Sequence, residues 1–149
     1  MNEYPEKAET PDIKIAELEI WIHGYQFPDS NDFWDGNQLN ATATCASKGA
    51  SVRVSGSFIH LSEIEHLETS AETLHRTLDG KAELSCMEPE LHVELEVNKL
   101  GQIEVVVNIT PDYMNQDHSF TFEIDQSYLP ELISECKRIL QKYPIRGQG

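Results

Sequence analysis

"LHVELEVNKLGQIEVVVNI", residues 91–109, decides the fold class of this chain. Apolar residues occupy every second position in both halves of the stretch, which is the period of a strand with one buried and one solvated face. Lys99-Leu100-Gly101 separates the halves, and glycine supplies the positive φ that a short hairpin turn needs. The stretch therefore predicts an antiparallel hairpin whose polar residues, including Glu94, Glu96 and Glu104, point toward solvent.

The same two-residue period recurs outside this hairpin. It is found in residues 18–22, 39–45, 52–58, 82–86 and 120–124. Together with the hairpin, these segments make about seven strands, each with one wet and one dry face, as in an antiparallel sheet.

Two segments have the spacing of an amphipathic helix instead, residues 62–78 and 127–142. Ser62 followed by Glu65 fits a capping box, and Gly80 is placed to end the first helix. Two such helices can cover the dry face of a sheet. The predicted fold is thus α+β, a two-layer sandwich of one largely antiparallel sheet, with about six to seven strands and both helices on one face.

The length of 149 residues suits one domain, expected over residues 13–146 after a flexible tail at residues 1–12. Cys45, Cys86 and Cys136 are far apart and odd in number, so they are expected to be reduced core thiols. The N-terminal residues lack the basic and apolar regions of a signal peptide, and no apolar run approaches the ~18 residues of a membrane span. A cytoplasmic location is therefore expected.

Charge limits the choice of partner. The chain has 11 basic and 26 acidic residues, a formal net charge of −15. Such a surface repels nucleic acid and anionic membranes, and it attracts a basic protein. The alternative is that the acidic charge only keeps the protein soluble. The sequence leaves the oligomeric state open.

No catalytic, cofactor or metal site is expected from the motifs. The histidines are scattered and form no metal-binding spacing: His23, His60, His66, His75, His92 and His118. No nucleophile elbow or phosphate loop is present. Glu94 and Glu104 could face each other across the hairpin, with Glu96 close by. An acid–base pair needs a pocket that separates the pKa values of its two carboxyl groups, and a flat, solvated sheet face provides none. The chain is therefore predicted not to be an enzyme.

"SNDFWDGNQLNAT", residues 30–42, superficially resembles a calcium loop. Oxygen ligands, the sixth-position glycine and the twelfth-position glutamate do not coincide in either possible register. A turn at Asp35-Gly36, with aromatic anchors on the sheet edge, fits better. Because tryptophan between acids also suits a protein contact, Asp32, Trp34 and Asp35 join Glu94, Glu96 and Glu104 as candidate partner-binding residues.

A family resemblance rests on three stretches: LEIWIHGYQFPDSNDFWDGNQLNATATC, EVVVNITPD and HSFTFEIDQSYLPELISECKRIL. Their turn, their Trp-Asp-Gly-Asn segment and their closing helix resemble the WapI-type immunity proteins of bacterial polymorphic-toxin and contact-dependent-inhibition systems. The resemblance covers most of residues 17–146.

This resemblance implies a cytoplasmic, non-catalytic protein that binds and neutralises a cognate toxin domain, often a nuclease, by stoichiometric contact. It carries over no residue-level toxin contact. The partner expected from charge and family together is a basic protein toxin domain. Two alternatives stay open: a non-catalytic housekeeping or scaffolding domain, and a hydrolase whose carboxylates the sequence does not locate.

Overall fold

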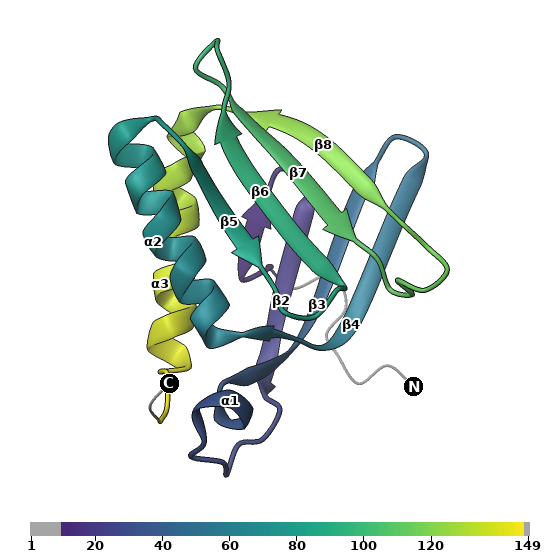
Figure 1. Ribbon diagram of the computed structural model, residues 1–149, viewed down its shortest axis with the longest axis vertical. Helices are drawn as coiled ribbons and strands as arrows, with labels where there is room; N and C mark the ends of the chain where they lie inside the picture. Colours follow the sequence, from purple (N-terminus) through teal and green to yellow (C-terminus); the bar gives the residue numbers. More distant parts are fainter. Residues whose placement is uncertain (1–9, 148–149) are drawn as a thin grey trace.

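Two antiparallel sheets, rather than one, carry the strands of this protein (Figure 1). The computed structural model describes residues 10–147. Their elements are β1 (Ile13–Ile15), β2 (Leu18–Tyr25), α1 (Phe33–Gly36), β3 (Gln38–Ser47), β4 (Ala50–His60), α2 (Leu61–Thr77), β5 (Lys81–Ser85), β6 (Leu91–Val97), β7 (Ile103–Ile109), β8 (Ser119–Ile124), the 3-10 turn η1 (Gln126–Tyr128) and α3 (Leu129–Lys142). Strands β1 to β4 form the first sheet in chain order, and strands β5 to β8 form the second.

The α+β class and the antiparallel pairing are confirmed, but the single sheet of six to seven strands is wrong. Alternation shows which side of a strand is dry, and it does not show which strand lies beside it. Helix α2 follows β4 directly and separates strands β1–β4 from strands β5–β8 along the chain. Each group of four strands pairs only within itself and forms its own sheet. Strand β1, with three residues, is too short to show a period.

The hairpin at residues 91–109 forms as the alternation predicts. Val97 pairs with Ile103, and Gly101 has a φ of +83° in the turn between them. The Asn98 side-chain oxygen accepts the backbone N–H groups of Leu100, at 2.9 Å, and Gln102, at 3.1 Å. This side chain therefore completes the turn that the glycine permits.

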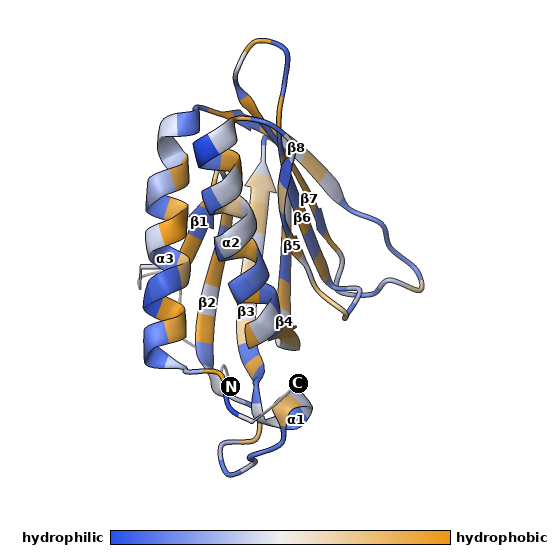
Figure 2. Cartoon of the chain, turned by 60° about the vertical axis from the view of Figure 1, so that its left-hand side comes forward, coloured by the Kyte–Doolittle hydropathy of each residue, from blue (hydrophilic) through white to orange (hydrophobic). Residues whose placement is uncertain are grey.

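Helices α2 and α3 lie side by side along one side of the sheet pair (Figures 1 and 2), so the expectation that they cover one face of a single sheet is wrong. Helix α3 packs on β1 and helix α2 on β5, which are the edge strands on this side. The N–H of Lys14 in β1 donates to Glu135 Oε1, and the N–H of Glu83 in β5 donates to Ser70 Oγ, both at 3.2 Å. The helices thus provide hydrogen-bond acceptors for part of these two strand edges, which could otherwise pair with strands of other molecules.

The inner faces of both sheets and the apolar stripes of both helices form one core. Its completely buried members include Ile20 and Ala43 of the first sheet, Leu95 and Val105 of the second, and Leu67 of α2. Polar and apolar positions lie on different sides of α3 in Figure 2. Outside this core, the outer face of the second sheet carries exposed glutamates, whereas on the outer face of the first sheet Trp21 and Thr42 are themselves buried.

The first long helix begins differently from the expected Ser62–Glu65 box. His60 Nδ1 accepts the N–H of Ser62 at 3.1 Å, and Glu63 Oε1 accepts the N–H of His60 at 2.8 Å, so a histidine serves as the N-cap. Leu78, at a φ of +53°, ends the helix two residues before Gly80. An imidazole nitrogen can accept a hydrogen bond as a serine oxygen does, but sequence rules for caps favour serine.

Cys45 and Cys136 are completely buried, as expected, and burial raises the pKa of Cys45 to about 11 and that of Cys136 to about 12. Cys86 packs against the core but is only partly buried, so the expectation of a buried position is met only in part for this residue. Its pKa is nevertheless raised, first by desolvation and then by the neighbouring Glu63 carboxylate. All three thiols are therefore poor nucleophiles at neutral pH.

No helix within residues 10–147 is both long and apolar enough to cross a lipid bilayer.

Candidate protein-binding surface

The outer face of the second sheet is acidic. Alternation buries every second residue of β6 and β7, such as Val93, Leu95 and Val105, and turns Glu94, Glu96 and Glu104 outward, as predicted. The neighbouring strands add Glu83 and Glu123, because Glu83 pairs with Glu94 and Glu123 pairs with Glu104. Alternation alone does not predict these two residues as part of the face, since their place on it depends on which strands are neighbours.

Three of these glutamates form a row across β6, β7 and β8. Glu96 pairs with Glu104, and Glu104 pairs with Glu123. Neighbouring strands lie about 4.8 Å apart, so the row is about 10 Å long. Like charges directly opposite each other are unfavourable, by ~0.2–1 kcal/mol per pair. Within residues 10–147, no ion pair neutralises Glu96 or Glu104.

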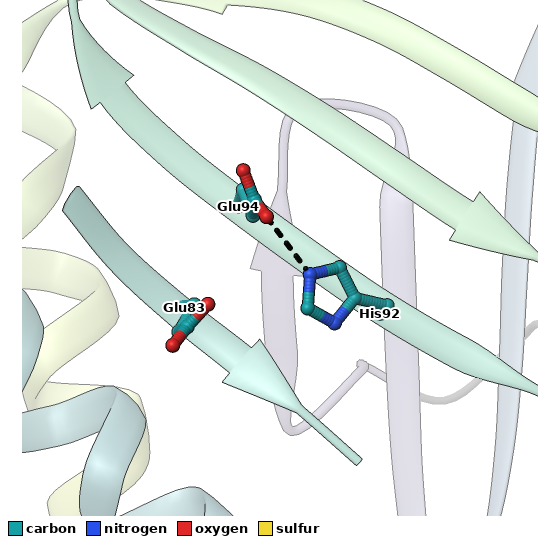
Figure 3. A group of neighbouring side chains, drawn as sticks. All are labelled: Glu83, His92 and Glu94. Carbon is teal, nitrogen blue, oxygen red and sulfur yellow. Dashed lines mark hydrogen bonds and ion pairs between the residues drawn. The ribbon is translucent and has the colours of Figure 1, made fainter. Parts of the chain in front are cut away.

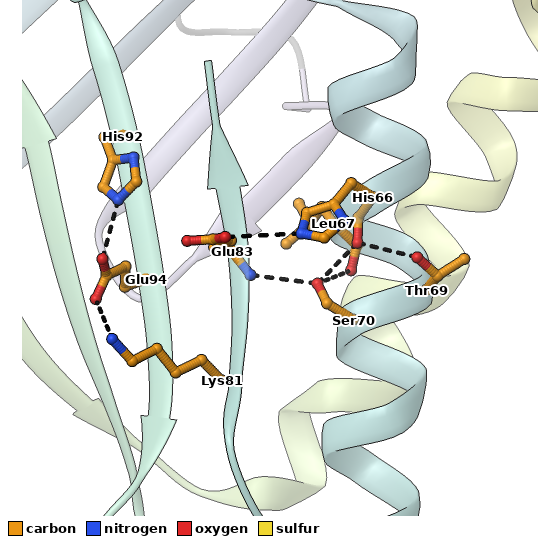
Figure 4. Close-up of polar contacts among 8 residues, drawn as sticks. All are labelled: His66, Leu67, Thr69, Ser70, Lys81, Glu83, His92 and Glu94. Atoms are coloured by element: carbon orange, nitrogen blue, oxygen red, sulfur yellow. Dashed lines mark hydrogen bonds and ion pairs between the residues drawn. The ribbon is translucent and has the colours of Figure 1, made fainter. Parts of the chain in front are cut away.

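Glu94 lies outside the row and is compensated. The register places it opposite Val106, so the suggestion that it faces Glu104 is wrong. Its carboxylate lies 3.1 Å from His92 Nε2 and 3.4 Å from Lys81 Nζ (Figure 4). The hydrogen bond from His92 is the main cause that lowers the pKa of Glu94, although desolvation opposes it. Lys81 lies opposite Glu96 on β5, but its ammonium pairs with Glu94, so within residues 10–147 the Glu96–Glu104–Glu123 row is left without an ion pair.

Exposed apolar side chains lie at both ends of the strands that carry this row. Leu100, at the tip of the β6–β7 hairpin, is 85% exposed. Tyr113 and Met114, in the connection from β7 to β8, are 59% and 76% exposed. Protein interfaces gain much of their affinity from such apolar anchors beside charged groups. Their place in turns between polar residues is the sequence signal that could have identified them.

The loop that carries Asp32, Trp34 and Asp35 contains the short helix α1. The Asp32 carboxylate accepts the N–H groups of Trp34, at 3.0 Å, and Asp35, at 2.9 Å, so it is the N-cap of this helix. Gly36 closes the turn, and a Cβ there would lie 2.9 Å from the Ser30 carbonyl oxygen. The Asp32 carboxylate is thus committed to the loop itself.

Asn37 fastens this loop to the C-terminal part of the chain. Its buried amide donates to the carbonyls of Phe33, at 2.7 Å, and Arg146, at 2.8 Å, and its oxygen accepts the Arg146 N–H at 2.8 Å. The Arg146 guanidinium donates to the carbonyls of Gly36 and Pro28 and lies 3.9 Å from the centre of the Tyr25 ring. The Trp-Asp-Gly-Asn segment therefore has a structural role, because it fixes the loop to residue 146.

Trp34 and Asp35 stay accessible. The indole is 56% exposed, although one side of it packs against the His60 ring at 5.6 Å between centroids. Both residues line a shallow hollow together with Met87 and Glu88 of the β5–β6 connection. Figure 1 places α1 at the end of the molecule opposite the β6–β7 hairpin tip. The six candidate residues thus fall into two regions, the glutamates of β6 and β7 and the α1 loop.

The arrangement suits binding better than acid–base catalysis. Glu96 and Glu104 are exposed on the outer strand face, whereas acid–base pairs in enzymes lie in environments that shift the pKa values of two groups apart. Among residues 10–147, the side chains of Glu83, His92 and Glu94 come close enough together to hold a metal ion.

Comparison with known proteins identifies one family. A model described as "Immunity protein WapI-like family" matches residues 11–144, a range that includes both sheets, both long helices and the α1 loop. The resemblance found in the sequence is thereby confirmed. No curated protein matches the chain.

Replacing the buried Asn37 by alanine should lower the free energy of unfolding by about 2 kcal/mol, because the partly buried Arg146 N–H would lose its acceptor and the carbonyls of Phe33 and Arg146 would lose a donor. Asn115→Ala is the matched control, since Asn115 is exposed and its amide contacts only the exposed Asp112. This control should change stability by less than about 0.5 kcal/mol. Urea unfolding followed by fluorescence measures the free energy of unfolding of both variants. An equal loss of stability in the two would contradict the structural role of Asn37.

Glu104→Lys should stabilise the free protein by about 1 kcal/mol at low salt, because two like-charge pairs become two opposite-charge pairs. The gain should shrink in 1 M salt, where the screening length falls to about 3 Å. The control is Glu65→Lys on the exposed side of α2, which makes the same charge change beside one glutamate, Glu68, three residues along the helix, instead of between two glutamates directly opposite. A loss of stability in Glu104→Lys would show that the row is not repulsive.

Proposed function

Because the chain belongs to the WapI-like family of immunity proteins, we propose that it binds and neutralises a cognate toxin domain by stoichiometric contact, without catalysis. The partner in this proposal is a basic protein, with nuclease-type toxins as the best match, and the encounter takes place in the cytoplasm. The acidic face of the second sheet is the main contact surface.

The Glu96–Glu104–Glu123 row carries the proposal. Its members repel one another in the free protein, and among the described residues neither Glu96 nor Glu104 is in an ion pair. Lys81 lies directly opposite Glu96 on β5, but its ammonium pairs with Glu94 instead. A partner that presents lysine or arginine side chains about 5 Å apart would match the strand spacing. Each close pair that becomes buried can contribute ~1.5–7 kcal/mol of coupling, and the long-range field accelerates encounter.

The preference for a nuclease follows from the chemistry of its substrate. Proteins that act on nucleic acids hold phosphates with lysine and arginine. An acidic surface on the inhibitor attracts the same side chains, so binding the inhibitor and binding the substrate compete. The net charge of −15 supports this match and disfavours nucleic acid or an anionic membrane as the direct ligand.

Apolar contacts would complete the interface. Leu100, Tyr113 and Met114 flank the acidic face along the strand direction, and they can supply the anchors that charge pairs alone do not. Trp34 and Asp35 form a second candidate contact at the α1 loop. They lie beside Met87, which belongs to the β5–β6 connection of the second sheet. Asp32 supports that region by capping α1 rather than by contact.

The test uses the toxin domain encoded next to this protein, purified in an inactive form. The double variant Glu96→Lys/Glu104→Lys should associate with it at least tenfold more slowly at low salt, because two attractive charges become repulsive. The difference in association rate between the double variant and the wild type should shrink as the salt concentration rises. Glu104→Lys alone should also slow association, whereas Glu65→Lys, which makes the same change of charge outside the row, should associate at nearly the wild-type rate.

Two results would contradict different parts of the proposal, the contact surface and the toxin binding itself. Wild-type association rates in the double variant would place the contact elsewhere, with the Trp34 loop as the next surface to test. Failure of the wild-type protein to bind this toxin or related ones would reject the toxin-binding proposal and favour the scaffolding alternative.

A further inference from the structure

Three metal-ligating side chains meet on the outer face of the second sheet, at one side of the glutamate row. Glu83 projects from β5, and His92 and Glu94 project from β6 two positions apart, on the same face (Figure 3). One ligand atom from each residue lies within 4.8 Å of the other two. We propose that this cluster binds one divalent transition-metal ion, with zinc(II) as the best match to its ligands.

The distances are close to those of a formed site. Zinc bonds of about 2.1 Å to nitrogen and oxygen place the ligand atoms of a tetrahedral site about 3.4 Å apart. His92 Nε2 and Glu94 Oε2 are already 3.1 Å apart. Glu83 must approach by little more than about 1 Å to complete three ligands at this spacing, which a change of side-chain torsion provides.

A second imidazole lies next to this cluster. His66 Nε2, from α2, is 3.7 Å from Glu83 Oε1. The bond from the Glu83 N–H to Ser70 Oγ holds this part of β5 against α2, so His66 and Glu83 stay neighbours (Figure 4). The ligand atoms that come within 4.8 Å of one another are thus one imidazole and two carboxylates, and His66 is an additional imidazole beside Glu83 outside this group. Nitrogen ligands favour zinc, nickel or copper over calcium and magnesium, which take oxygen.

The local charge also favours a cation. Glu83 and Glu94 are directly opposite each other on adjacent strands, where two carboxylates repel. Lys81 Nζ lies 3.4 Å from Glu94 Oε1 and leaves Oε2 directed toward His92. The side chains of Glu83, His92 and Glu94 are 35%, 33% and 36% exposed, so a hydrated ion can reach them while solvent screens them only in part.

This inference revises the expectation of no metal site. A histidine and a glutamate separated by one residue, with a third ligand from the next strand, form no recognisable sequence motif. The site requires the β5–β6 pairing, which the sequence did not reveal. It stands independently of the proposed toxin binding.

Calorimetric titration of the metal-stripped protein with zinc chloride at pH 7 tests the proposal. We expect one saturable site per chain, weakened at least tenfold by His92→Gln or Glu83→Gln, because each removes a ligand. Glu104→Gln is the matched control for charge, since it loses one carboxylate on the same face outside the cluster. His66→Gln should weaken binding less than His92→Gln does, because His66 lies beside Glu83 outside the three-residue cluster, and His75→Gln is its control on the exposed side of α2.

The pattern of variants decides the outcome. The controls should bind zinc like the wild type, and magnesium chloride should give no saturable binding. Circular dichroism of each variant confirms that it is folded. The proposal is overturned if the wild type shows no saturable one-to-one binding, if His92→Gln binds as well as the wild type, or if Glu104→Gln weakens binding as much as Glu83→Gln does.

Discussion

The dry interface between the two sheets is the constraint on which the rest of the structure depends. Leu95 and Val105 are completely buried against the first sheet and the helices. Side chains of a strand alternate, so burying these residues forces Glu94, Glu96 and Glu104 outward. A slip of one residue would carry glutamates into the core, which makes both the register and the acidic face consequences of the same packing.

The parts of this fold that can be predicted from sequence are those with a local period. The β6–β7 hairpin, its outward glutamates and the two long helices follow from repeats of two and of 3.6 residues. The division into two sheets depends on which strands become neighbours, and no local pattern encodes that choice. Glu123 and the Glu83–His92–Glu94 cluster escaped prediction for the same reason. His60 as an N-cap escaped because it breaks the usual residue preference at helix starts.

Distinctive sequence and candidate function lie in different places in this protein. The Trp-Asp-Gly-Asn segment is its most recognisable stretch, yet Gly36 and Asn37 serve to close the α1 loop and tie it to Arg146. The candidate binding surface uses ordinary solvent-facing glutamates, whose meaning comes from their arrangement. An immunity protein gains from this division, since a fixed scaffold can carry a charged face that is tuned to one partner.

Carboxyl-group footprinting of the protein, alone and with its cognate toxin domain, tests the central claim most directly. Chemical labelling of each carboxylate is quantified by mass spectrometry, so the covered residues are read without mutation. The account predicts that Glu96, Glu104 and Glu123 lose labelling in the complex, whereas Glu65 on α2 keeps it. A complex that forms while these three glutamates remain fully labelled would contradict the account.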